Sequence, residues 1–141
     1  MERGQLGVSY QTITVFVFDG LIAECSHPRA DQLACMAARW ERALSMWEWD
    51  VLVLDHMHDM MSRFQSQVEV ITWKPPAFAQ LVHNRLWEMD VPVSETTSAL
   101  SYQSASQRIA TDPLISAVYD GNPHHRHGYG FKAREFVPGQ M

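Results

Sequence analysis

Three polar residues that could bind phosphate or metal follow strand-like segments of this 141-residue chain. Asp19 follows the apolar run 13–18, Thr72 ends the run 68–72, and Asp120 follows the run 114–119. Carboxylates are ligands that Mg²⁺ prefers, and a hydroxyl beside the first amides of a helix suits phosphate oxygens. Lys74, two residues after Thr72, would add positive charge. Together these residue types have the chemistry of a phosphoryl-transfer site.

The segments around these residues predict a framework that brings them together. Uninterrupted runs of β-branched and aromatic residues are typical of strands buried on both faces of a parallel sheet. Apolar residues then recur at helical spacing from Leu33 to Trp47, and again from Phe78 to Met89. This alternation predicts an α/β fold, with a single doubly wound, mostly parallel sheet and helices on both faces. The carboxyl ends of such strands share one edge, so we expect the strand ending at Asp19 in the centre, flanked by the other two.

The apolar stripes of these helices should form the core against the sheet. We expect five of their side chains to be buried, namely Trp40, Leu44, Phe78, Leu81 and Leu86.

Three further segments complete the predicted layout. Residues 51–55 could form another buried strand, but the absence of Gly and Pro from 56 to 64 favours a helix there. Residues 94–106, rich in Ser and Thr, predict a polar loop before a short helix around 106–110. Residues 134–137 predict a closing strand.

Composition restricts the classes of function. With 46% hydrophobic residues, the chain can bury the core of a single domain, which we expect to span residues 1–141. Its formal charge of −5 disfavours nucleic acid and anionic membranes as partners, because both require a basic face. No apolar run approaches the roughly 20 residues of a membrane span, and residues 1–5 lack a signal-peptide core. We therefore expect a cytoplasmic protein or part of a larger intracellular assembly, with Cys25 and Cys35 as free thiols.

At its three polar motifs, the chain resembles the haloacid dehalogenase-like (HAD) superfamily of phosphatases. The resemblance covers about residues 12–138 and rests on segments 18–24, 68–73 and 117–123, the last leading into 130–131 and 136–139. It implies a HAD-like, Rossmannoid fold. It also implies that Asp19 and Asp120 would bind Mg²⁺, and that Asp19, Thr72 and Lys74 would form a catalytic site, in relic or weak form.

The chain departs from this family at the residues that would perform the chemistry. In the register that fits the downstream residues better, Val17 occupies the position of the nucleophilic Asp, and valine can neither attack phosphorus nor bind Mg²⁺. In the alternative register Asp19 is the nucleophile, and Leu21 replaces the general acid. Gly121 removes a second acidic metal ligand, and Arg108 is the nearest candidate for the family's basic residue.

Two functions follow from these departures as hypotheses. Simultaneous loss of a nucleophile and a metal ligand predicts a HAD-like domain with degraded phosphatase motifs. Such a domain would act as a binding or structural protein, with an unknown protein partner or as a homo-oligomer, and its Mg²⁺ binding would be weak or absent. The alternative is a divergent Mg²⁺-dependent phosphatase or nucleotidase that uses Asp19, Thr72, Lys74 and Asp120.

Histidines form another candidate site. His124, His125 and His127 follow the turn after the third strand, while His56 and His58 lie elsewhere. Imidazole is a common transition-metal ligand. Adjacent histidines at a turn are usually solvated, and no cysteine or carboxylate stands at a recognised ligand spacing beside them. The sequence therefore disfavours a metal site in this cluster.

Overall fold

The computed structural model describes residues 12–24, 44–64, 66–99 and 101–138. Its main sheet has five parallel strands in the order β5-β4-β1-β6-β7. The bounds of these strands are β1 Ile13–Val17, β4 Gln67–Thr72, β5 Glu95–Ser98, β6 Ile115–Tyr119 and β7 Ala133–Arg134. The prediction of a parallel α/β sheet is confirmed, with the strand before Asp19 at its centre between the strands that end at Thr72 and before Asp120.

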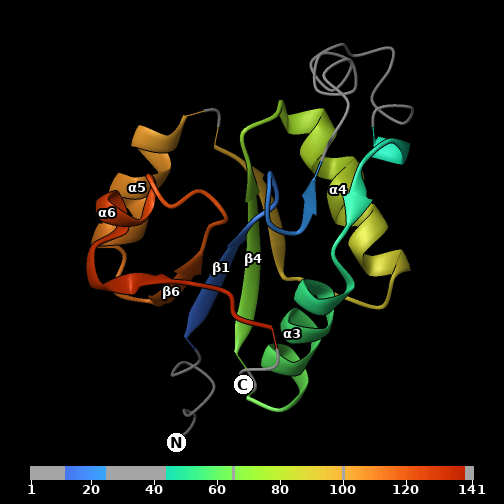
Figure 1. Ribbon diagram of the computed structural model, residues 1–141, viewed down its shortest axis with the longest axis horizontal. Helices are drawn as coiled ribbons and strands as arrows, with labels where there is room; N and C mark the ends of the chain where they lie inside the picture. The colour runs from blue at the N-terminus through green and yellow to red at the C-terminus, as the bar shows by residue number, and fades with distance from the viewer. Residues whose placement is uncertain (1–11, 25–43, 65, 100, 139–141) are drawn as a thin grey trace, which may run out of the picture.

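Helices cover both faces of the sheet (Figure 1). One face packs against α3 (Val51–Ser62) and α4 (Pro76–Glu88), and the other packs against α5 (Tyr102–Thr111), α6 (Arg126–Tyr129) and the 3-10 turn η3 (Gly130–Lys132). Successive residues of a strand point to opposite faces. Phe16 accordingly joins the core under α3 and α4, while Val15 and Val17 join the core under α5.

Local signals explain where the helices begin. The Asp50 side chain accepts hydrogen bonds from the backbone amides of Leu52 and Val53, so it caps the first turn of α3. This cap makes residues 51–62 a helix, as predicted, although the first five could also have formed a strand. At the start of α4, Pro75 and Pro76 occupy positions where no amide donor is needed.

The prediction of a polar loop over residues 94–106 is wrong. Residues Glu95–Ser98 form strand β5, which pairs with β4, and α5 begins at Tyr102 instead of near residue 106. An edge strand has only one neighbour, so it tolerates polar residues, and threonine suits extended backbone because it is β-branched. The closing strand also differs from the prediction, because β7 covers only Ala133–Arg134.

The core largely follows the predicted helical stripes. Leu44, Phe78 and Leu86 are buried, and Leu81 is partly buried against the same cluster. Trp40 lies outside the described residues, as do both cysteines. A small antiparallel pair of strands, β2 (Ala23–Glu24) and β3 (Glu48–Trp49), adds Trp49 to this core beside Phe18, and Trp47, directly before β3, also packs against Phe18. No helix in the described part of the chain is long and apolar enough to cross a membrane.

Candidate functional site

The carboxyl ends of β1 and β4 meet at Asp19. Its Oδ1 accepts a hydrogen bond from the Thr72 hydroxyl at 2.7 Å and another from the backbone N–H of Trp73 at 3.0 Å. Lys74 Nζ lies 3.9 Å from Asp19 Oδ2. The structure therefore brings together three of the four residues that the sequence singled out, because parallel strands end at a common edge.

The Asp19 carboxylate is charged only at an energetic cost. Its side chain is 12% exposed, and Oδ2 is buried with no hydrogen-bond partner. Burial raises the pKa of this carboxyl above the ordinary 3.8, while the Trp73 and Thr72 hydrogen bonds and the Lys74 charge oppose that rise. Desolvation is the largest of these influences. The folded protein therefore favours the neutral form of Asp19 more than the unfolded chain does.

The donors around Asp19 form a small anion cradle, which we define as the Thr72 hydroxyl, the Trp73 amide and the Lys74 ammonium. The cradle lies at the junction between β4 and α4, where unpaired amides and the helix dipole favour negative charge. The Lys74 amide in turn donates to the Thr72 hydroxyl oxygen at 3.2 Å, which orients the hydroxyl proton toward Asp19. A carboxylate of the chain itself thus occupies donors that would suit a bound phosphate.

Val17 contributes nothing to this edge. Its side chain is completely buried in the core beneath α5, together with Val15 and Ile71. Leu21 is partly buried against the opposite core. Neither residue presents a polar group, so Asp19 is the one carboxylate that residues 17–21 supply.

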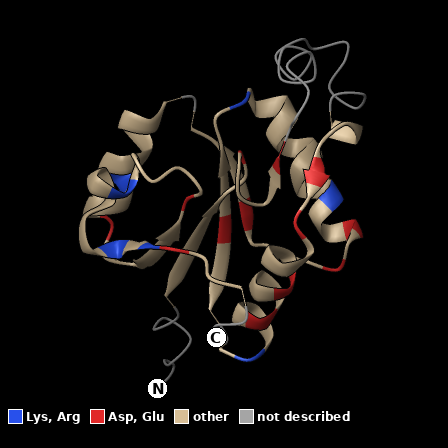
Figure 2. Ribbon diagram, in the orientation of Figure 1, with Lys and Arg blue, Asp and Glu red and all other residues tan. Residues whose placement is uncertain are grey.

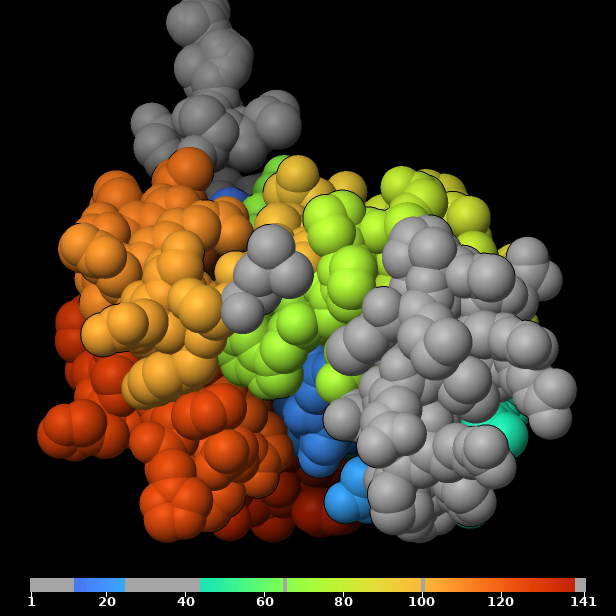
Figure 3. Space-filling view, turned by 90° about the horizontal axis from the view of Figure 1, so that it is seen from above, coloured from blue at the N-terminus to red at the C-terminus, as the bar shows by residue number. Residues whose placement is uncertain are grey.

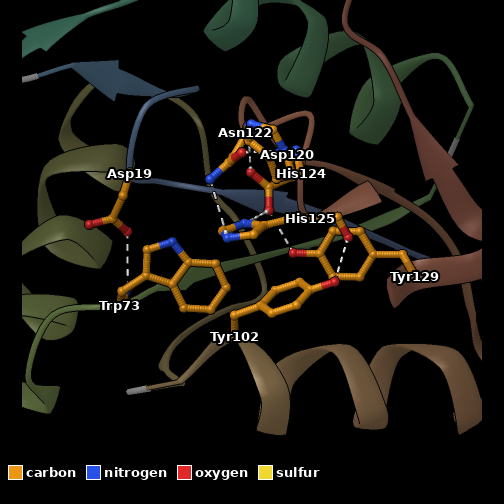
Figure 4. Close-up of polar contacts among 8 residues, drawn as sticks. All are labelled: Asp19, Trp73, Tyr102, Asp120, Asn122, His124, His125 and Tyr129. Carbon is orange, nitrogen blue, oxygen red and sulfur yellow. Dashed lines mark hydrogen bonds and ion pairs between the residues drawn. The ribbon is translucent and has the colours of Figure 1, made fainter. Parts of the chain in front are cut away.

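Asp120, on the turn after β6, has its own set of donors (Figure 4). Its Oδ1 accepts from the backbone N–H of Asn122 at 2.9 Å, and its Oδ2 accepts from the Tyr129 hydroxyl at 2.6 Å and from His125 Nδ1 at 2.8 Å. Burial raises the pKa of Tyr129, and the Asp120 carboxylate raises it further, so Tyr129 remains a donor. Figure 4 shows the Asp19 and Asp120 carboxylates each turned toward their own donors.

The turns after β1 and β6 touch at two glycines. A Cβ atom on Gly121 would lie 2.5 Å from the Gly20 carbonyl oxygen, which is closer than real Cβ contacts allow. An acidic residue at position 121 would therefore force this backbone to shift. The close approach of the two turns therefore gives a direct steric reason for glycine at position 121.

Aromatic side chains surround His125 beside Asp120. The Tyr102 ring stacks on the imidazole with centroids 4.2 Å apart and planes 16° apart, and Trp73 meets it edge-on at 5.6 Å. The Tyr102 hydroxyl also donates to the His125 carbonyl oxygen at 2.7 Å. From above, the turn after β1 lies between the β4–α4 junction and the orange-red β6–α6 segment (Figure 3).

Sequence reasoning missed most of this second cluster. In the sequence His125 stands out only as a member of a histidine run, and the structure leaves its neighbours His124 and His127 exposed. Tyr102 and Tyr129 carry no motif that connects them with Asp120. Arg108, the candidate for the basic residue, pairs with Glu69 of β4 at 3.0 Å. Among the described residues, no group of three histidine, cysteine or acidic side chains could hold a metal ion.

The fold and this edge define an α/β protein with a parallel sheet flanked by helices and two carboxylate-centred clusters at the carboxyl ends of its central strands. No family model, curated protein or solved structure matches the chain.

Proposed function

We propose that this chain is a HAD-like scaffold without phosphatase chemistry and that it acts as a binding or structural protein. The observation that carries the proposal is the position of Asp19, whose carboxylate occupies the Thr72 hydroxyl and the Trp73 amide. A phosphate would have to displace this carboxylate from the cradle. The phosphate would then lie beside the negative charge of the Asp19 carboxylate. Lys74 is the cation that the cradle supplies to offset these charges.

The chemistry of the donor set also disfavours a magnesium centre shared by Asp19 and Asp120. Three hydrogen bonds already reach the Asp120 oxygens, and the Gly20 carbonyl leaves no room for a carboxylate at position 121. Mg²⁺ demands near-ideal octahedral geometry from oxygen ligands. These residues do not fit that ion.

A binding role has physical support on the surface of the protein. Several large apolar side chains are exposed, among them Phe131 at 84% and Val51 at 65%. Among the residues that the structure describes, Lys and Arg are spread over several elements and do not gather on one face (Figure 2). Since polyanions require a continuous basic face, we propose a protein partner or a second copy of this chain.

Phosphatase activity provides the direct test. With Mg²⁺ and a panel of phosphate monoesters, we expect turnover no higher than that of Asp19→Asn, because position 17 supplies no nucleophile. Phosphate release is the measurement, and the melting temperature of each sample verifies folding. Robust Mg²⁺-dependent hydrolysis that Asp19→Asn abolishes would establish the alternative, a divergent phosphatase with Asp19 as the nucleophile.

A further inference from the structure

We propose that His125 is the general base of a metal-independent hydrolytic site at the carboxyl edge of the sheet. Asp120 is its positioning residue, water is the nucleophile, and a neutral carboxylic ester is the class of substrate. The inference stands apart from the binding role proposed above, because it uses the β6–α6 turn instead of the cradle around Asp19. Either proposal can fail without the other.

The hydrogen bonds around His125 determine which ring nitrogen is basic. Asn122 Oδ1 accepts from the His124 backbone N–H at 2.9 Å, so the nitrogen of the same amide faces His125 Nε2 at 3.3 Å. An amide nitrogen only donates, so Nε2 is the unprotonated nitrogen and its lone pair accepts from the Asn122 N–H. Nδ1 must then carry the proton that it donates to Asp120 Oδ2 at 2.8 Å. This is the arrangement of a histidine base oriented by a carboxylate.

The imidazole is also held rigidly while it remains accessible. Tyr102 stacks on one face, Trp73 contacts the ring edge-on, and the Tyr129 hydroxyl fixes the same Asp120 oxygen at 2.6 Å. The His125 side chain is still 21% exposed, whereas that of Asp120 is 1% exposed. The buried Asp120 carboxylate already holds the His125 imidazole in one orientation. Little reorganisation of the ring is therefore required for proton transfer, which lowers the barrier.

Charge and neighbouring groups indicate the substrate. The Asp19 and Asp120 carboxylates border the site, so a phosphate dianion would be repelled more than a neutral ester. In the described part of the chain, the hydrogen-bond partner of Nε2 is the Asn122 amide and not a hydroxyl or thiol. Water is therefore the available nucleophile. When this water replaces the Asn122 N–H at Nε2, the released N–H can donate to the developing oxyanion.

The reaction balances without a cofactor. His125 Nε2 takes a proton from water as the oxygen forms a bond to the acyl carbon, and the carbonyl electron pair moves onto its oxygen. When that pair returns, the bond between the acyl carbon and the alcohol oxygen breaks. The leaving oxygen takes the proton from His125, so the products are a carboxylic acid and an alcohol, and the neutral imidazole is restored.

The test is the hydrolysis of p-nitrophenyl acetate by the full chain in EDTA, followed by release of p-nitrophenolate. We expect His125→Gln to lower kcat by about 10²-fold, the lower end of what a general base contributes. His127→Gln is the matched control, since it changes an exposed nearby histidine outside the proposed site and should keep the wild-type rate. The wild-type rate should also fall in D₂O. Equal rates for wild type and folded His125→Gln, an equal loss in His127→Gln, or loss of activity in EDTA would each overturn the proposal.

Asp120→Asn tests the positioning role separately. An asparagine amide can donate to Nδ1, which would move the imidazole proton to Nε2, as in other histidine bases that lose their carboxylate. We expect kcat to fall, KM to change little, and the ¹⁵N shifts of the His125 ring to report the other tautomer. A rate loss with the original tautomer would overturn the positioning role.

Chemical modification of the wild type replaces these variants if they do not fold. Carbethoxylation of His125, located by mass spectrometry, must then abolish activity, and retained activity would overturn the proposal.

Discussion

A single carboxylate, that of Asp19, links the ends of two neighbouring strands. It accepts from the Thr72 hydroxyl and the Trp73 amide, while its other oxygen is buried without a hydrogen-bond partner. A buried oxygen of this kind raises the energy of the charged form. Ionised Asp19 therefore destabilises the folded protein electrostatically, and a neutral side chain of the same shape would avoid this cost.

We expect Asp19→Asn to raise the melting temperature at neutral pH. The folded-state pKa of Asp19 is raised by burial, so its stabilising contribution is complete below 3.8 and is lost as the pH rises through the folded value. Asparagine keeps the acceptor for Thr72 and Trp73 but removes the charge. The measurement is the melting temperature of both proteins from pH 3 to 7.

The difference between the two proteins should widen with rising pH in favour of the variant. A lower melting temperature for Asp19→Asn at every pH would show that the ionised carboxylate stabilises the fold through Lys74 instead.

Removing the carboxylate altogether should expose the cradle. In Asp19→Ala, the Thr72 hydroxyl, the Trp73 amide and the Lys74 ammonium lose their internal anion, and sulfate can take its place. A ligand that binds only the folded state stabilises it by about 2.7 kcal/mol at 100 times its Kd. We expect sulfate to raise the melting temperature of this variant and not that of the wild type, with chloride at matched ionic strength as control.

The double variant Asp19→Ala/Thr72→Val removes one donor of the cradle and should respond less to sulfate. An equal response of wild type and Asp19→Ala would mean that the anion binds elsewhere.

The elements of this protein owe their positions to apolar stripes and to the ends of helices. Helix α4 begins at two prolines and turns Phe78, Val82 and Leu86 toward the sheet. The Phe78 ring is completely buried and meets Phe18 edge-on, with centroids 6.0 Å apart. Since Phe18 directly precedes Asp19, the packing of α4 also supports the strand end that carries this carboxylate.

We expect Phe78→Ala to lower the free energy of unfolding by about 3–5 kcal/mol, because it leaves a cavity between α4 and the sheet. Phe131→Ala is the control, since that side chain is 84% exposed and should change stability by less than about 0.5 kcal/mol. Urea unfolding gives both values. An unchanged midpoint for Phe78→Ala would contradict the packing of α4 described here.

At the scale of the whole molecule, one buried histidine joins helix α3 to segments that are distant in the sequence but lie on the same face of the sheet. His56 of α3 is buried, lies edge-on to Phe16 and Phe136, and places Nε2 3.3 Å from the Tyr119 hydroxyl of β6. Burial lowers the pKa of His56 from its ordinary 6.5, with Asp59 acting in the opposite direction. Protonation of this ring would therefore disturb contacts among α3, β1, β6 and the C-terminal segment.

We expect acid to destabilise the protein partly through His56. Because the folded-state pKa lies below 6.5, this contribution to stability is present above 6.5 and is lost as the pH falls through the folded value. His56→Gln should reduce the loss of stability between pH 7.5 and pH 5, measured by urea midpoints. His58→Gln, which changes an exposed histidine of the same helix, should retain the wild-type dependence.

The sequence by itself determined the three central strands of the sheet and one half of the edge. Uninterrupted apolar runs indicated buried parallel strands, and the polar residues at their ends indicated a shared edge, so Asp19, Thr72 and Lys74 could be expected near one another. This inference works because burial follows from local periodicity, and parallel strand direction follows from the helices between the strands. A residue directly after a strand is then placed by the end of that strand. The sequence also revealed that Val17 lacks the chemistry of a nucleophile.

Only the tertiary structure determines the other half of this edge, which is the cluster around Asp120. Nothing in the spacing of Tyr102, His125 and Tyr129 connects them with Asp120, because they come from α5, α6 and the preceding turn, and meet only when these pack together. The contact between Gly20 and Gly121 likewise exists only after β1 and β6 pair. Periodicity encodes which face of an element is buried, but the partner of a buried polar atom depends on which distant segment the packing brings within hydrogen-bond distance.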